Sequence, residues 1–142
     1  MKKIILIVCT VFIVVLGLIA GGKAYMHSMK PDLNVNEIIV STSLDADGKP
    51  IDVLGQVTDV DITREMKKAY VSIPVNSRRL ESSKVIVTYQ GTTVDEQEIE
   101  VSKAGYVTYC LENIESLESG LYLMAFYDSK NTVNVYAAVE VE

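Results

Sequence analysis

From residue 37 onward, apolar and polar side chains alternate with a period of two along most of the chain. Such alternation is typical of β-strands with one buried and one solvated face, because successive side chains point to opposite sides of a strand. Seven segments rich in Val, Ile, Thr and Tyr have this pattern: 37–43, 68–75, 84–90, 93–101, 105–112, 121–128 and 132–141. About seven short strands separated by turns predict two packed antiparallel sheets, an all-β sandwich.

The same alternation predicts the core and the exposed edges. We expect these side chains to be buried: Val71, Ile73, Val75, Val85, Val87, Tyr89, Val107, Tyr109, Leu111, Tyr122, Met124 and Phe126. Residues 96–100, Glu-Gln-Glu-Ile-Glu, indicate an exposed edge strand, where charge discourages pairing with another chain. Tyr106, Tyr127 and Tyr136 fall on outward faces, where we expect cross-strand packing, with a partner-binding patch as the alternative. Residues 44–67 have no regular pattern, and Asp45 to Pro50 have the composition of a turn.

The first thirty residues differ sharply from the rest. Residues 4–22 contain no charge, and at a helical rise of about 1.5 Å per residue they span roughly 28 Å, the thickness of a bilayer core. We predict a transmembrane signal-anchor at 4–22, with residues 1–3 in the cytoplasm, 23–36 as a juxtamembrane tether and 37–142 as a domain outside the membrane. A cleaved signal peptide is one alternative, although the run exceeds the roughly 7–15 apolar residues usual for one. Lipid attachment at Cys9 is a second, because residues 6–9, Leu-Ile-Val-Cys, faintly resemble a bacterial lipobox.

The charge of the domain excludes some classes of partner. Residues 31–142 contain nineteen Asp and Glu but only nine Lys and Arg, which gives a net charge of −10. A domain this acidic has no electrostatic attraction to nucleic acid or to an anionic lipid surface. We therefore expect no nucleic-acid partner, and we expect contact with the membrane through the N-terminal helix.

The domain sequence lacks the residues of common catalytic centres. His27 is the only histidine and lies in the predicted tether, so no Ser-His-Asp or Cys-His arrangement is available in the domain. Cys9 lies in the membrane segment and Cys110 in the domain, which leaves no disulfide framework and no set of Cys and His ligands for zinc. We interpret Cys110 as a strand-packing residue.

Calcium is the one metal for which the sequence offers candidate ligands. Asp45, Asp47 and Asp52 flank Gly48 and offer hard oxygen ligands, but the ligand spacing of an EF-hand loop is missing. We interpret the segment as an Asp- and Gly-rich turn. We therefore assign no catalytic, cofactor-binding or metal-binding residue and expect no enzyme.

Residues 117–127, Leu-Glu-Ser-Gly-Leu-Tyr-Leu-Met-Ala-Phe-Tyr, have the spacing of a tyrosine corner. In such a corner, Leu117 would close the core, Gly120 would allow the tight turn, and the Tyr122 hydroxyl would bond to backbone a few residues upstream. Together with "LDADGKPI" and "KVIVTYQG", this segment resembles the immunoglobulin-like and fibronectin type III-like domains that follow a single membrane anchor on bacterial surfaces. The resemblance covers residues 36–142 and implies an immunoglobulin-like Greek-key β-sandwich, with Tyr89 where a core Trp is common.

The resemblance implies a spacer, an adhesive domain or a subunit-binding module. We expect a non-catalytic, membrane-anchored, extracytoplasmic binding or structural module that contacts a protein partner through a sheet face. One alternative is a subunit of a larger membrane complex. Another, from a different class, is a hydrolase of envelope polymers that acts through paired carboxylates.

Overall fold

The computed structural model describes residues 31–59 and 61–142. The predicted signal-anchor at 4–22, the predicted cytoplasmic residues 1–3 and His27 lie outside the described residues. Within the described ranges, no helix is long and apolar enough to cross a membrane.

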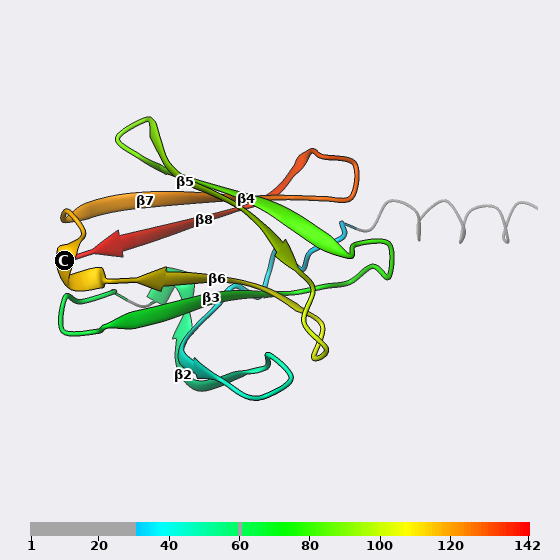
Figure 1. Cartoon of the computed structure of the whole chain (residues 1–142), viewed down its shortest axis with the longest axis horizontal. Coiled ribbons are helices and arrows are strands. Elements are labelled where there is room, and N and C mark those ends of the chain that lie inside the picture. Colours follow the sequence, from blue (N-terminus) through cyan, green and yellow to red (C-terminus); the bar gives the residue numbers. More distant parts are fainter. Residues whose placement is uncertain (1–30, 60) are drawn as a thin grey trace, which may run out of the picture. The chain divides into compact units, whose positions relative to one another are not determined.

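Eight strands and two single-turn 3-10 helices form the described part of the chain (Figure 1). They are β1 (Ile39–Leu44), β2 (Pro50–Gln56), η1 (Val57–Asp59), β3 (Lys68–Pro74), β4 (Ser82–Tyr89), β5 (Thr92–Glu100), β6 (Tyr106–Glu112), η2 (Ile114–Ser116), β7 (Gly120–Tyr127) and β8 (Val133–Val141). All seven predicted strands are present, because alternation marks any strand with one buried face.

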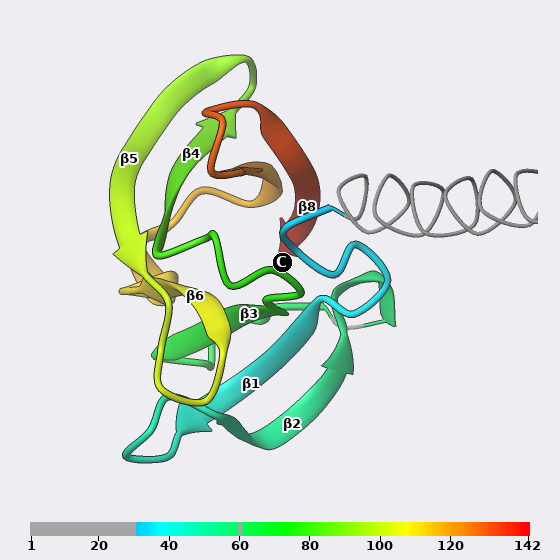
Figure 2. The ribbon, with the colours of Figure 1, turned by 90° about the vertical axis from the view of Figure 1, so that its right-hand side faces the viewer.

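The strands form two four-stranded antiparallel sheets in the orders β2-β1-β3-β6 and β5-β4-β7-β8. Figure 2 shows them as two layers, with β5 and β6 at the same side of the domain. These two strands follow one another in the chain but belong to different sheets, since residues 101–105 cross between the layers. The predicted all-β, two-sheet arrangement is confirmed, and β5 is an edge strand as its charges predicted.

The core lies between the two sheets and consists mainly of the alternating residues that the sequence predicted. Ten of the twelve are buried, while Val75 and Tyr89 are partly buried and pack against the core. Each fully buried Val, Leu, Ile or Phe side chain contributes about 1.5–3 kcal/mol relative to an exposed one. Leu33, from the predicted tether, is also buried and forms an isolated bridge with Val75.

Strand β2 was not predicted, because its pattern is hidden by a bulge. The turn before it forms as expected, with Gly48 N donating to Asp45 O at 3.1 Å. The register of β1 against β2 then shifts between Val40 and Ser41, so one extra residue enters β2 and the alternation breaks. Ile51 and Val53 share one face, and the extra residue Leu54 follows Val53 directly. All three are exposed, and a period-two search does not recognise the strand.

The predicted tyrosine corner is present at the start of β7. The Tyr122 hydroxyl donates to Glu118 O at 3.0 Å. Gly120 has φ +138°, and a Cβ at this position would lie 3.1 Å from Cε2 of Tyr89. The backbone conformation therefore favours glycine, and an added Cβ would press against the Tyr89 ring.

Candidate binding surfaces

The outward side chains of β4, β7 and β8 form a continuous apolar surface. Strand register places Leu123 beside Ala138, and Ala125 between Ile86 and Tyr136. Leu121, Leu123 and Tyr136 are 51%, 40% and 66% exposed. We call this surface the apolar face; it consists of Ile86, Leu121, Leu123, Ala125, Tyr136 and Ala138.

Carboxylates border the apolar face on both sides. On β5, Glu96 lies opposite Ile86 and Glu98 lies opposite Lys84, while on β8 Glu140 lies opposite Leu121. The Lys84 ammonium stacks 4.4 Å from the centroid of the Tyr127 ring. The apolar face therefore has an acidic border.

The three tyrosines predicted to point outward do not come together. Tyr136 belongs to the apolar face, and Tyr127 lies beyond its end under Lys84. Tyr106 is in the other sheet, paired with Pro74 of β3. Of the three, only Tyr136 is a large exposed side chain, which makes it the one candidate for partner contact.

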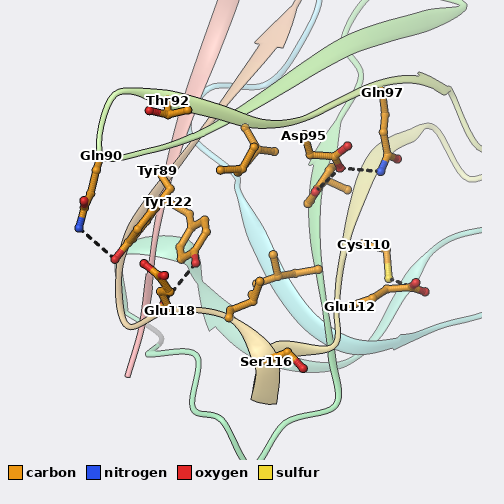
Figure 3. A pocket seen from close by; sticks show the side chains of 15 residues that line it. Tyr89, Gln90, Thr92, Asp95, Gln97, Cys110, Glu112, Ser116, Glu118 and Tyr122 are labelled. Carbon is orange, nitrogen blue, oxygen red and sulfur yellow. Dashed lines mark hydrogen bonds between the residues drawn. The ribbon is translucent and has the colours of Figure 1, made fainter.

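A cleft of about 680 Å³ opens between β5 and β6, where the edges of the two sheets meet (Figure 3). We call it the cleft. Figure 3 shows Tyr89 and Tyr122 at one end of it and Cys110 and Glu112 at the other. Apolar atoms come from Val87, Val94, Leu111 and Leu117. The sequence did not predict this feature, because alternation does not report how far apart two sheets stand at their edges.

A hydrogen bond joins the two sheets inside the cleft. The Tyr109 hydroxyl on β6 donates to Oδ2 of Asp95 on β5 at 2.6 Å, and the Gln97 side-chain amide donates to the same oxygen at 2.8 Å. Burial raises the pKa of Tyr109, and the hydrogen bond to Asp95 and its negative charge raise it further. Tyr109 is thus held neutral as a donor.

The cleft is acidic. Its described lining contains the carboxylates Asp95, Glu112 and Glu118 and no Lys, Arg or His. Glu112 also forms an ion pair with Lys68, at 3.2 Å. Asp95 and Glu118, which have no cation beside them in the described lining, give the cleft a negative potential that attracts cations.

The aspartates that the sequence offered as calcium ligands form hydrogen bonds within the β1–β2 hairpin. Asp45 Oδ1 accepts the backbone N–H groups of Asp47 and Lys49 at 2.9 and 2.8 Å, and Asp52 accepts the Ser43 hydroxyl. These aspartates hold the β1–β2 turn. Across residues 31–59 and 61–142, no group of three His, Cys, Asp or Glu side chains is placed to hold a metal ion.

Cys110 is half-buried and lies 3.7 Å from the Glu112 carboxylate, to which its thiol donates. Burial raises the pKa of this thiol, and the Glu112 charge raises it further. A raised pKa keeps the sulfur in the unreactive thiol form at neutral pH. This environment is the opposite of the electropositive surroundings that activate a catalytic cysteine.

Comparison with protein-family models and with curated proteins finds no match for this chain.

Proposed function

We propose that this chain is a non-catalytic binding module, held at the outer surface of a bacterial membrane by its N-terminal segment, and that it binds a protein partner through the apolar face. The observation that carries the proposal is the exposure of Leu121, Leu123 and Tyr136 side by side on one sheet. Contiguous apolar surface of this kind is typical of interaction sites. The membrane location rests on the nineteen uncharged residues at 4–22.

We also propose that the domain is immunoglobulin-like, which the order of its strands supports. In the order β5-β4-β7-β8, strands β4, β7 and β8 fit the C, F and G strands of such domains, and β3 and β6 fit B and E in the other sheet. The tyrosine corner falls at the start of β7, where these domains place it before strand F. On this assignment β1 is strand A and β2 is an added edge strand.

The acidic border determines the kind of partner that fits. Glu96, Glu98 and Glu140 would face the rim of anything bound to the apolar face. A second copy of this domain would bring the same carboxylates and a net charge of −10 against them, so self-association is opposed by repulsion. We therefore propose a partner with an apolar centre and a rim of Lys and Arg, which would include a neighbouring subunit of a membrane complex.

The proposal is tested by site-specific photocrosslinking of the full-length protein in intact membranes. A photoreactive residue replaces Leu123 in one variant and Val53 in another, because Val53 is also apolar and exposed but lies on β2. We expect a discrete crosslinked protein from position 123 and none of that mass from position 53.

The captured protein is then purified and its affinity for Leu123→Glu and Val53→Glu is measured. We expect Leu123→Glu to weaken binding by about tenfold or more, as for a residue central to an interface, and Val53→Glu to leave it unchanged. Binding to the wild type should weaken as salt is added. Equal effects of the two substitutions, or crosslinking from position 53 alone, would refute the role of the apolar face.

A further inference from the structure

We infer that the cleft is a second binding site, separate from the apolar face, and that it takes an extended peptide segment bearing Lys or Arg, which adds as a strand to the free edge of β6. Neither the fold nor the proposed function requires such a site. The inference rests on the pairing of β6, the course of the chain beside it and the charge of the cleft.

Strand β6 has an unpaired edge along the cleft. It is the last strand of its sheet and pairs with β3 alone in the described chain. Tyr109, Cys110, Leu111 and Glu112 all line the cleft, although alternate residues of a strand point to opposite faces. Consecutive residues can share a cleft only where it follows the backbone edge of the strand, so the N–H and C=O groups of this edge are within its reach.

The position beside β6 is left open by the connection that precedes it. The chain passes from β5 in one sheet to β6 in the other through residues 101–105, without a strand of its own in between. An added strand would lie about 4.8 Å from the free edge of β6. A volume of about 680 Å³ falls within the range of roughly 300–1,000 Å³ found for ligand sites.

The lining of the cleft fits alternate apolar and cationic side chains. An added strand would point every second side chain inward, toward Tyr109 and Leu111, and would reach the rings of Tyr89 and Tyr122 at one end. Tyrosine rings bind both apolar groups and the cationic groups of Lys and Arg. Asp95 and Glu118 add negative charge, and no cation of the described lining competes for them. An acidic peptide would be repelled.

The test uses a defined probe, the capped heptapeptide Lys-Val-Lys-Val-Lys-Val-Lys, with the full-length protein in nanodiscs of zwitterionic lipid. Two matched controls are the same peptide methylated on every backbone nitrogen, which leaves neither of its edges able to donate to a strand ladder, and the heptapeptide with Glu in place of Lys. Hydrogen–deuterium exchange by mass spectrometry reports where backbone amides become protected. We expect slower exchange in 106–112 and no change in 50–56, the edge strand β2 of the same sheet.

The charge requirement is tested by substitution. The double variant Glu112→Gln/Glu118→Gln should bind the Lys peptide about tenfold more weakly. The control is Glu140→Gln/Glu142→Gln, which makes the same change of charge on β8 and just after it. This control should leave the affinity unchanged. Equal weakening by both pairs would mean that net charge alone attracts the peptide and would overturn the site.

The peptide controls separate the remaining outcomes. Equal binding of the methylated peptide would overturn strand addition, and equal binding of the Glu peptide would overturn the choice of a cationic ligand. Absence of binding, or protection confined to residues outside 106–112, would overturn the assignment of the cleft. None of these outcomes bears on crosslinking at Leu123, so the proposed function stands or falls separately.

Discussion

The rings of Tyr89 and Tyr122 stack with their centroids 4.7 Å apart, and their hydroxyls donate to two successive carbonyls, those of Ser119 and Glu118. The two residues are paired in register on β4 and β7. The tyrosine corner of this domain is therefore double: two aromatic side chains from neighbouring strands hold the segment that leads from η2 into β7.

Replacement of Tyr122 by Phe should destabilise the domain while preserving its fold. The ring is buried and its hydroxyl donates at 3.0 Å to Glu118 O, a bond of a kind that contributes about 1 kcal/mol. Urea denaturation of the full-length protein in detergent micelles measures the loss. Tyr89→Phe should cost less, because its bond to Ser119 O is exposed to solvent. An unchanged midpoint for Tyr122→Phe would show that this bond does not stabilise the corner.

Gly120→Ala should be more damaging than Gly91→Ala. At Gly120 the φ of +138° is a conformation essentially confined to glycine, which costs other residues about 1–3 kcal/mol, and the added Cβ would meet the Tyr89 ring at 3.1 Å. Gly91 has φ +78° and no atom within 4 Å of an added Cβ, so its replacement adds strain without a clash. Thermal unfolding of the two variants gives the comparison. Equal losses would mean that the ring moves aside freely.

The sequence predicts this corner and the two-sheet class because both depend on local spacing. Tyr122 and Gly120 are two residues apart, and each predicted strand has its own alternation. The partner Tyr89 and the strand β2 were missed for different reasons. Tyr89 lies thirty-three residues before Tyr122 in the chain, so no local spacing connects it to the corner. The bulge beside Val40 interrupts the alternation of β2.

The two candidate binding surfaces also differ in how much of each the sequence predicts. Leu121, Leu123 and Tyr136 alternate with buried residues, so the sequence indicates that they point outward but not that register aligns them into one surface. The cleft depends on the separation of β5 and β6, which no spacing within either strand encodes. Its location and its acidity both depend on the fold, which brings Asp95, Glu112 and Glu118 together.

Tyr109→Phe should destabilise the domain at neutral pH and change its response to alkali. The bond to Asp95 at 2.6 Å is one of the links between the sheets, and a hydrogen bond to a charged group contributes about 1.5–3 kcal/mol. The pKa of Tyr109 is raised in the folded protein, so its stabilising contribution is complete below about pH 10, the pKa of an unfolded tyrosine. It is lost as the pH rises further, because the unfolded chain releases this proton first.

Urea denaturation at neutral pH and above pH 10 tests this prediction. The wild type should lose stability over the alkaline range, and Tyr109→Phe should lose less over the same range, although it starts from a lower value. Tyr136→Phe is the matched control, because that ring is 66% exposed. Parallel alkaline profiles for wild type and Tyr109→Phe would exclude Tyr109 as the group responsible.

Asp32 connects the start of the described chain to the turn between β7 and β8. It is buried, and its Oδ2 accepts the Ser129 N–H at 3.0 Å and the Ser129 hydroxyl at 2.6 Å, in the turn between β7 and β8. Burial alone would raise its pKa, but the hydrogen bonds from Ser129 and Ser77 and the charge of Arg79 lower the pKa below the ordinary value. The ionised form is therefore the one that the folded state favours.

Because the pKa of Asp32 is lowered in the folded state, we predict that its stabilising contact with the β7–β8 turn is lost in acid. A lowered pKa stabilises the fold above the pKa of an unfolded aspartate, about 3.9, and this contribution is lost as the pH falls through the lower pKa of the folded state. Asp32→Asn should lower stability at pH 7 and flatten its decline below about pH 4, since the group that titrates there is gone. Asp47→Asn is the control, because it removes one exposed carboxylate and so makes the same change of charge. Its stability should depend on pH as that of the wild type does. If the stability of Asp32→Asn fell in acid as steeply as that of the wild type, the acid response would have to come from other carboxylates. The role of Asp32 would then be limited to positioning the start of the described chain.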